Sequence, residues 1–318
     1  MGRTEYDPIR QKAVRKRTAM AALMIFLAIP FVIFLSTVLG GGRFYMIMSV
    51  LVIICCMMPF FLVFEKRKPK AREIVLVAMM SAITCAAHMV LHVTVPLQIG
   101  TAMIIVAGIA MGPEAGFLVG ALSRFVCNFY IGQGPWTPWQ MFCWGLLGFL
   151  AGLCFNKVDI TNKTEKMKSR SFQVIMGPVL CVVFAMILAY ISYLVLPEAT
   201  DTVGKMLGWR FYVFGAVGLL AGVLLQRKRM PVDHVTITVF TFFSTMIIYG
   251  GIMNIASMFT TSGMMNSGFS LEALRLLYIS GLPYDIAHGV AAAFCIFLIG
   301  DPMIRKIERI KIKYGIYK

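Results

Sequence analysis

The sequence predicts an all-α fold: a polytopic membrane bundle of about ten transmembrane helices. Hydrophobic residues occupy 59% of the 318 positions, and charged residues only 14%. Soluble domains carry roughly a quarter charged residues, so this composition indicates a chain whose solvent is lipid. Apolar stretches of about 20 residues, the length that crosses a bilayer, recur along the sequence.

These stretches set the order of the expected helices. The first one follows a basic segment without a small-residue cleavage site, so we expect it to be retained as a helix. The fourth to sixth are short for a hydrocarbon core of about 30 Å, so they should be tilted, broken or partly covered by loops. The predicted spans are 18–39, 44–64, 73–93, 99–111, 114–129, 139–155, 172–196, 209–225, 235–260 and 283–300.

Charge placement predicts the orientation. The net charge is +16, and the basic residues form short blocks between apolar runs. If the chain starts inside, 25 of the 30 Lys and Arg residues fall in cytoplasmic segments, as the positive-inside rule requires. We therefore expect a multi-pass protein of a prokaryotic inner membrane, with both termini cytoplasmic and lipid rather than nucleic acid as its surroundings.

Several kinds of chemistry have no signature in the sequence. It contains no GxxxxGK[ST] phosphate loop and no HExxH motif. The eight cysteines lie in apolar stretches without a CxxC pair, which is typical of reduced core residues. We expect no catalytic residue, no metal site and no cofactor, and a chain that does not hydrolyse ATP by itself.

The third span has two distinct faces. Ala78, Ala82 and Ala86 form a stripe of small residues that allows another helix to approach closely, within this chain or from a partner. His88 and His92 lie one turn apart on the opposite face, near the outer end. Intramembrane histidines usually face protein or water, so these two serve either packing and hydrogen bonding or contact with a ligand.

The outer connection Asn128–Gln140 (NFYIGQGPWTPWQ) is uncharged and rich in Gly, Pro and Trp. Gly and Pro favour a rigid, non-helical cover, and Trp136 and Trp139 offer broad apolar faces with one N–H donor each. Tryptophans at this depth also serve as interfacial anchors. We interpret the segment as a lid over a ligand, with polar contacts from Asn128, Gln133 and Gln140.

Further polar residues lie at similar depths in the last two spans. Tyr249 and Asn254 interrupt one apolar helix, and Asp285 and His288 are expected near the start of the next, where Asp285 could also act as a helix cap. All of these lie toward the outer side, which predicts a pocket for an organic ligand with a polar rim. Arg124, within the fifth span, needs a carbonyl or acidic partner.

The sequence also contains an internal echo. Trp139–Phe155 aligns without gaps with Trp209–Leu225, with six identities that include both central glycines. The echo is explained either by a duplicated hairpin or by the small-residue spacing common where helices pack in lipid.

These motifs resemble a known family. Gly112–Gly152, with its GPWTPWQM run, and the segments Tyr249–Asn254 (YGGIMN) and Gly281–Arg309 look like the substrate-binding S component of energy-coupling factor (ECF) vitamin transporters. The resemblance covers 73–156 and 235–309 and implies a six-helix core that captures a vitamin-class molecule from outside. It further implies docking of Ala78, Ala82 and Ala86 on a transmembrane coupling subunit, with two cytoplasmic ATPase subunits using the ATP.

The resemblance also suggests how the chain is divided. Among such proteins, the GPWTPWQM run looks closest to those proposed for cobalamin and related corrinoids. Trp139–Phe155, rather than its echo, would then provide the fourth core helix. The expected division is a basic N-terminus with two additional helices (1–72), the first part of the core (73–156), an inserted or duplicated helix pair (157–234), the last two core helices (235–309) and a basic tail (310–318).

Two other functions remain open at this stage. The echo and the intramembrane charges Arg124 and Asp285 also suit a secondary transporter that works alone. An intramembrane enzyme would need paired carboxylates or a metal motif, and the sequence has neither.

Overall fold

The computed structural model describes residues 71–94, 99–155, 166–195, 209–225, 230, 232–265 and 271–316, together with 23, 27–32, 51 and 54. Helices make up nearly all of this part of the chain, and it contains no strand beyond one isolated bridge. The predicted all-α membrane bundle is therefore confirmed. The predicted spans 18–39 and 44–64 lie almost wholly outside the described residues.

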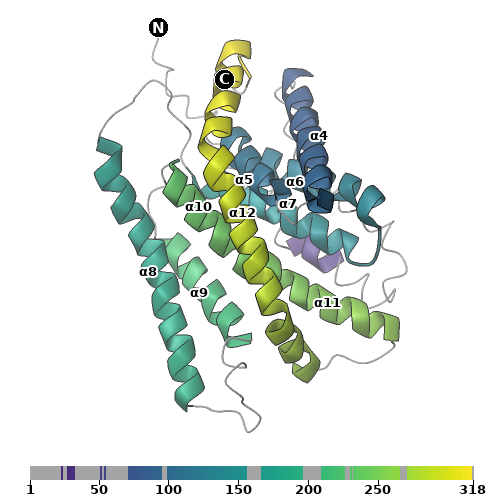
Figure 1. Ribbon diagram of the computed structural model, residues 1–318, viewed down its shortest axis with the longest axis vertical. Helices are drawn as coiled ribbons and strands as arrows, with labels where there is room; N and C mark the ends of the chain where they lie inside the picture. Colours follow the sequence, from purple (N-terminus) through teal and green to yellow (C-terminus); the bar gives the residue numbers. More distant parts are fainter. Residues whose placement is uncertain are drawn as a thin grey trace.

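Each of the eight later spans corresponds to helical structure (Figure 1). The span 235–260 is one unbroken helical rod with a π-helical stretch, η3, in its middle. The elements are α4 (Ala71–Thr94), α5 (Ile99–Met111), α6 (Pro113–Ile131), α7 (Thr137–Cys154), α8 (Lys166–Val195), α9 (Trp209–Leu225), α10 (His234–Phe243), η3 (Ser244–Tyr249), α11 (Gly250–Met265) and α12 (Leu271–Tyr314).

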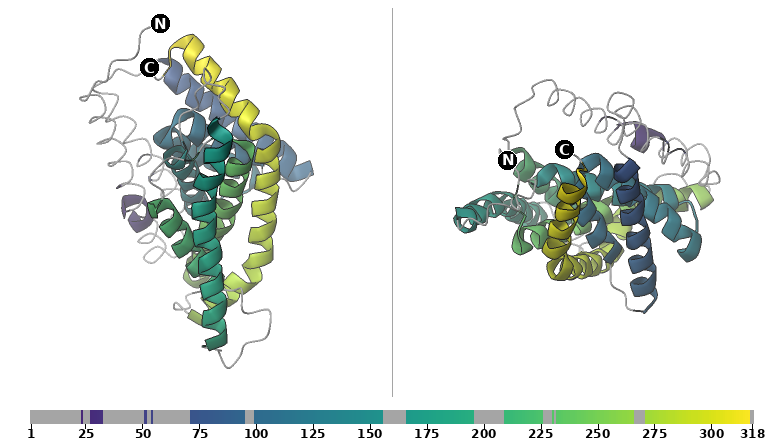
Figure 2. Two further views of the ribbon diagram at one scale, coloured as in Figure 1. Left: turned by 90° about the vertical axis from the view of Figure 1, so that its left-hand side faces the viewer. Right: turned by 90° about the horizontal axis from the view of Figure 1, so that it is seen from above.

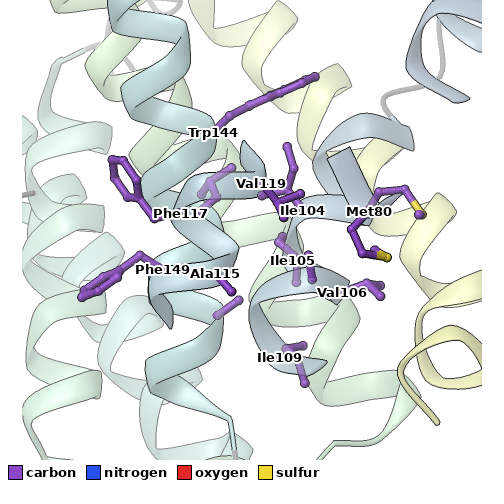
Figure 3. Close-up of a cluster of buried hydrophobic side chains, with 14 of the residues drawn as sticks. Met80, Ile104, Ile105, Val106, Ile109, Ala115, Phe117, Val119, Trp144 and Phe149 are labelled. Atoms are coloured by element: carbon purple, nitrogen blue, oxygen red, sulfur yellow. The ribbon is translucent and has the colours of Figure 1, made fainter. Parts of the chain in front are cut away.

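Within the described part, three helical stretches are long and apolar enough to cross a membrane: Ala71–Leu91, His234–Thr260 and Glu272–Tyr314. Helix α5 has only 13 residues, about 20 Å at the usual rise, and every residue of it except Ile99 is buried. A helix that is apolar all round belongs in the core, and Figure 3 shows Ile104, Ile105 and Val106 of α5 within the cluster of buried side chains.

Helices α5, α6 and α7 touch through glycines. A Cβ atom on Gly108, Gly116 or Gly148 would overlap backbone atoms of one of the other two. Small residues of this kind allow membrane helices to approach backbone to backbone. The contact fixes the α6–α7 hairpin, and the half of the hairpin next to the connection 132–136 carries many of the polar residues discussed below.

The pair α8–α9 stands beside α10 and α12, on the other side of the bundle from α4 (Figures 1 and 2). Gly218 of α9 packs on Cys181 and Ala185 of α8, while its echo partner Gly148 packs inside the core. Helix α9 has most of its contacts with α8, whereas α7 packs on α5 and α6. The chain leaves the core after α7 and returns to it beside the same point before α10. The Met230 amide donates there to the Cys154 carbonyl at 2.7 Å.

Helix α12 is much longer than the predicted span 283–300. It begins at Leu271, so Pro283 and Asp285 lie inside the helix rather than at its start, and the expected position of Asp285 near a helix start was wrong. The predicted span began at Pro283, but membrane helices tolerate an internal proline where neighbouring groups satisfy the freed carbonyl.

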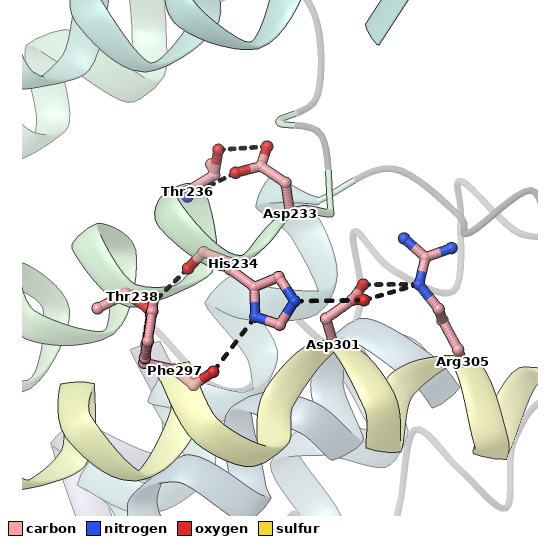
Figure 4. A network of polar contacts seen from close by, with 7 residues as sticks. All are labelled: Asp233, His234, Thr236, Thr238, Phe297, Asp301 and Arg305. Carbon is pink, nitrogen blue, oxygen red and sulfur yellow. Dashed lines mark hydrogen bonds and ion pairs between the residues drawn. The ribbon is translucent and has the colours of Figure 1, made fainter. Parts of the chain in front are cut away.

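Polar contacts join the helices at the end expected to be cytoplasmic. Asp233 caps α10 by accepting from the Thr236 amide at 2.9 Å. The carboxylate of Asp301 on α12 accepts from Arg305 at 2.8 Å and lies 3.7 Å from the His234 imidazole (Figure 4). At the same end Lys311 donates to the Ala110 carbonyl and Arg72 to the Tyr314 carbonyl, which ties α4, α5 and α12 together.

Candidate functional site

A buried polar cluster lies between α4, α6 and α7, and Gln140 is its centre. The Gln140 side-chain oxygen accepts from Arg124 Nε and from the Asn128 amide, both at 2.9 Å. The same Asn128 amide reaches the Thr137 hydroxyl at 3.1 Å, and that hydroxyl also accepts from the Gly134 backbone. The carbonyl-type partner expected for Arg124 is therefore an amide oxygen.

Aromatic rings enclose the Arg124 guanidinium. Its carbon lies 4.9 Å from the centroid of the Trp144 ring, a cation–π contact. The His88 ring meets the same indole edge-on at 4.9 Å, and its Nε2 lies 3.3 Å from Arg124 Nη1. His88 is 1% exposed, on the face of α4 opposite the alanine stripe, as predicted.

Within the described part of the chain, several buried polar atoms of α6, α7 and their connection have no hydrogen-bond partner. They are the side-chain oxygens of Asn128 and Gln133 and the indole N–H groups of Trp139 and Trp144. Buried polar atoms are paired in the great majority of cases, so each exception calls for an explanation. These two donors and two acceptors are groups that a polar ligand could bind.

The first turn of α5 connects this cluster to the last helix. Gly100 lies against the His88 and Trp144 rings, so close that a Cβ there would overlap the indole. The next residue, Thr101, is 3.0 Å from the His288 Nε2, and the His288 ring packs edge-on against Tyr249 at 4.7 Å. Tyr249 ends the π-helical stretch η3, a geometry found frequently at functional sites.

A second polar cluster surrounds Asp285, one turn before His288. Its carboxylate accepts hydrogen bonds from the Tyr212 hydroxyl and, at 2.9 Å, from the Asn254 amide. Gly250 and Gly281 give these groups room, since a Cβ on either would overlap Asp285 or Asn254. Tyr212 comes from α9, so the additional helix pair contributes directly to this cluster.

The connection between α6 and α7 is shorter than the predicted non-helical lid. Only Gly132–Trp136 lies outside the helices, because Asn128 belongs to α6 and Trp139 and Gln140 to the first turn of α7. Gly132, with φ 128°, ends α6, and Pro138 is tolerated in the first turn of α7, where an N–H is unpaired anyway. The helix ends thus carry most of the polar residues attributed to a loop.

The three side chains of this connection lie in different settings. Trp139 is buried, and its ring is nearly parallel to that of Phe259 on α11, with 6° between the planes and 6.2 Å between the centroids. Trp136 is 42% exposed and lies over Gly134 of its own loop, apart from the buried cluster. Gln133 donates to the Phe125 carbonyl at 3.2 Å.

The alanine stripe and His92 are the other predicted features of α4. Ala78, Ala82 and Ala86 all lie on its exposed face, while the side chain of His92 lies outside what the structure describes. No group of three or more His, Cys, Asp or Glu residues within the described part could hold a metal ion.

Reasoning from sequence missed four contributors, namely Thr101, Thr137, Trp144 and Tyr212. Trp144 lies in an apolar run and Tyr212 in the additional pair, so neither had a local polar signal. Thr137, inside the GPWTPWQM run, was the one whose position could have been noticed.

One of the comparisons with known proteins found a match, which covers less than half of the chain. The family model described as "ECF-type riboflavin transporter, S component" matches residues 68–207. The matched region contains α4, α6 and α7, which supply the whole cluster around Gln140. Neither the curated proteins nor the solved structures yield a match.

The match supports an ECF S component. Since the matching model describes the S component of a transporter, the match favours a transporter subunit over an enzyme. Together with the apolar helices, the match supports a membrane-embedded, multi-pass protein.

Proposed function

We propose that this chain is the substrate-binding subunit of an ATP-driven ECF importer and captures a vitamin-class micronutrient from the outer side of the membrane. The observation that carries the proposal is the cluster around Gln140. It is buried among apolar helices, it keeps donors and acceptors unused, and it lies inside the segment that the S-component family model matches.

Two vitamins are the candidates for the cargo. The GPWTPWQM run favours cobalamin or a related corrinoid, whereas the matching family model is named for riboflavin. Both molecules combine a large ring system with amide or imide groups. The nearly parallel Trp139 and Phe259 rings suit a flat ring system, and the unused polar atoms suit its polar edges.

Helix α4 would connect the coupling subunit to the substrate site. Its alanine stripe is exposed, while the other face of the same helix carries His88 into the polar cluster. A coupling subunit that binds the stripe would therefore act on a helix that also contacts the site. Small residues let such a partner approach the helix backbone closely.

Uptake into proteoliposomes tests this proposal and separates it from a secondary transporter. We expect radiolabelled riboflavin or cyanocobalamin to accumulate only when the chain is reconstituted with its coupling and ATPase subunits and ATP is supplied. ATP replaced by a non-hydrolysable analogue is the matched control. Accumulation by the chain alone, driven by an ion gradient, would contradict the proposal and favour the stand-alone transporter.

A further inference from the structure

Among the residues that the structure describes, no carboxylate contacts the buried cation Arg124. It is 9% exposed, and its side-chain contacts in the described part of the chain are the Gln140 oxygen, the His88 ring and the Trp144 ring. None of these three groups carries a negative charge. A buried charge normally requires a counter-charge or a full set of hydrogen bonds, so this position costs stability.

The guanidinium also has donors to spare. Of its five N–H groups, Nε–H is used by Gln140 and one Nη1–H faces His88. The Trp144 indole, over which the guanidinium lies, has a buried N–H without a partner. The two side chains therefore offer several donors and a positive charge in one place.

The carboxylate of the second polar cluster, Asp285, does not contact the Arg124 guanidinium. The Asp285 carboxylate bonds instead to Tyr212 and Asn254. Among the described residues, Asp285 is therefore not one of the groups that contact Arg124.

We infer that Arg124 is a specificity-determining residue that binds an acceptor-rich edge of the substrate: imide or amide carbonyls, a carboxylate or a phosphate. This inference rests on the proposed function and narrows its substrate class. The planar fork of the guanidinium can take two acceptor oxygens side by side, and the Trp144 N–H adds a third donor next to it. A cationic vitamin without such an edge is repelled by the same charge.

Purified full-length protein in detergent tests this with four probes: riboflavin, cyanocobalamin, pantothenate and thiamine. The first three carry carbonyl, phosphate or carboxylate oxygens, whereas thiamine is a cation with none of these. Dissociation constants are measured for wild type, Arg124→Met and Arg124→Lys. The matched control is Arg305→Met. It removes an arginine that pairs with Asp301 in the C-terminal part of α12, away from the Gln140 cluster.

We expect wild type to bind at least one of the first three probes, and Arg124→Met to weaken that binding by at least about thirtyfold, the size of a lost charged hydrogen bond. Arg124→Lys keeps the charge but not the fork, so its affinity should fall between the two. Arg305→Met should stay within about twofold of wild type. The thermal midpoint of Arg124→Met should stay the same or rise, because the substitution removes an uncompensated buried charge. If Arg124 only stabilised the fold, the midpoint would fall.

Affinity of Arg124→Met within about threefold of wild type would overturn the inference, as would wild-type affinity in Arg124→Lys. Binding of thiamine alone would also overturn it, while leaving the proposed function in place. A wild-type protein that binds none of the four vitamins would contradict the proposed function itself, and the inference with it.

Discussion

At the scale of single residues, the site is built from side chains that bridge helices far apart in the sequence. Gln140 connects α6 and α7, His288 connects α12 and α5, and Asp285 connects α12 with α9 and α11. In a membrane, such polar groups must find partners inside the protein. Each bridge therefore holds the bundle together, and we propose that it also places a polar group within reach of a ligand.

Trp139 and Trp136 allow a matched comparison of one substitution at two depths. Trp139→Phe removes an unpaired N–H and part of a ring that stacks on Phe259. We expect ligand affinity to fall about five- to tenfold, equivalent to about 1 kcal/mol. The affinity of Trp136→Phe, at an exposed position, should stay within about twofold of wild type. Both affinities are measured by titration of tryptophan fluorescence with the ligand. Equal effects of both substitutions would contradict a ligand contact specific to Trp139.

Tyr212→Phe tests the link between α9 and the core. The substitution removes one donor from the buried Asp285 carboxylate and leaves it with Asn254. We expect the free energy of unfolding to fall by about 1–3 kcal/mol, measured as a lower thermal midpoint. Tyr130→Phe, at an exposed position, is the control. An unchanged midpoint for Tyr212→Phe would show that the hydroxyl does not hold α9 in place.

At the scale of helices, α4 combines two roles on opposite faces. Its buried face carries His88, and its exposed face carries Ala78, Ala82 and Ala86. Ala82→Leu adds bulk only on the exposed face, so we expect vitamin affinity to be kept and ATP-dependent uptake to be lost. The neighbouring exposed Ile83→Leu should leave both unchanged. Normal uptake by Ala82→Leu would remove the docking role of the stripe.

The α8–α9 pair behaves geometrically like an insertion, because the chain leaves after Phe155 and returns at Met230 beside it. We expect a protein in which a short Gly-Ser linker replaces 157–229 to fold and to bind the vitamin, with a lower thermal midpoint because Asp285 loses Tyr212. Loss of folding or of binding, checked by size-exclusion chromatography and titration, would show that the pair is part of the core.

The sequence predicted helices better than it predicted their ends and mutual contacts. Apolar length fixes where a span must lie, which is why all eight described spans contain helices. The start of α12 was missed because the apolar span was predicted only over 283–300, whereas the helix begins at Leu271. Asn254 and Asp285 were recognised because they are polar residues in apolar spans. The pairing of Asp285 with Tyr212 depends on how the helices lie side by side, which no local sequence pattern encodes.

At the scale of the whole molecule, the polar residues divide into two groups. The described contacts of Arg72, Asp233, Asp301 and Lys311 lie at the end expected to face the cytoplasm. The buried donors and acceptors of the site lie in the other half of the bundle. This separation suits a protein that binds a ligand on one side of the membrane and meets its ATPases on the other.

Native mass spectrometry of the protein purified from its own host in mild detergent tests the central claim most directly. We expect a complex that contains a coupling subunit, two ATPase subunits and a bound molecule of vitamin mass. A lone chain without a small ligand, which is active in proteoliposomes without ATP, would contradict the account.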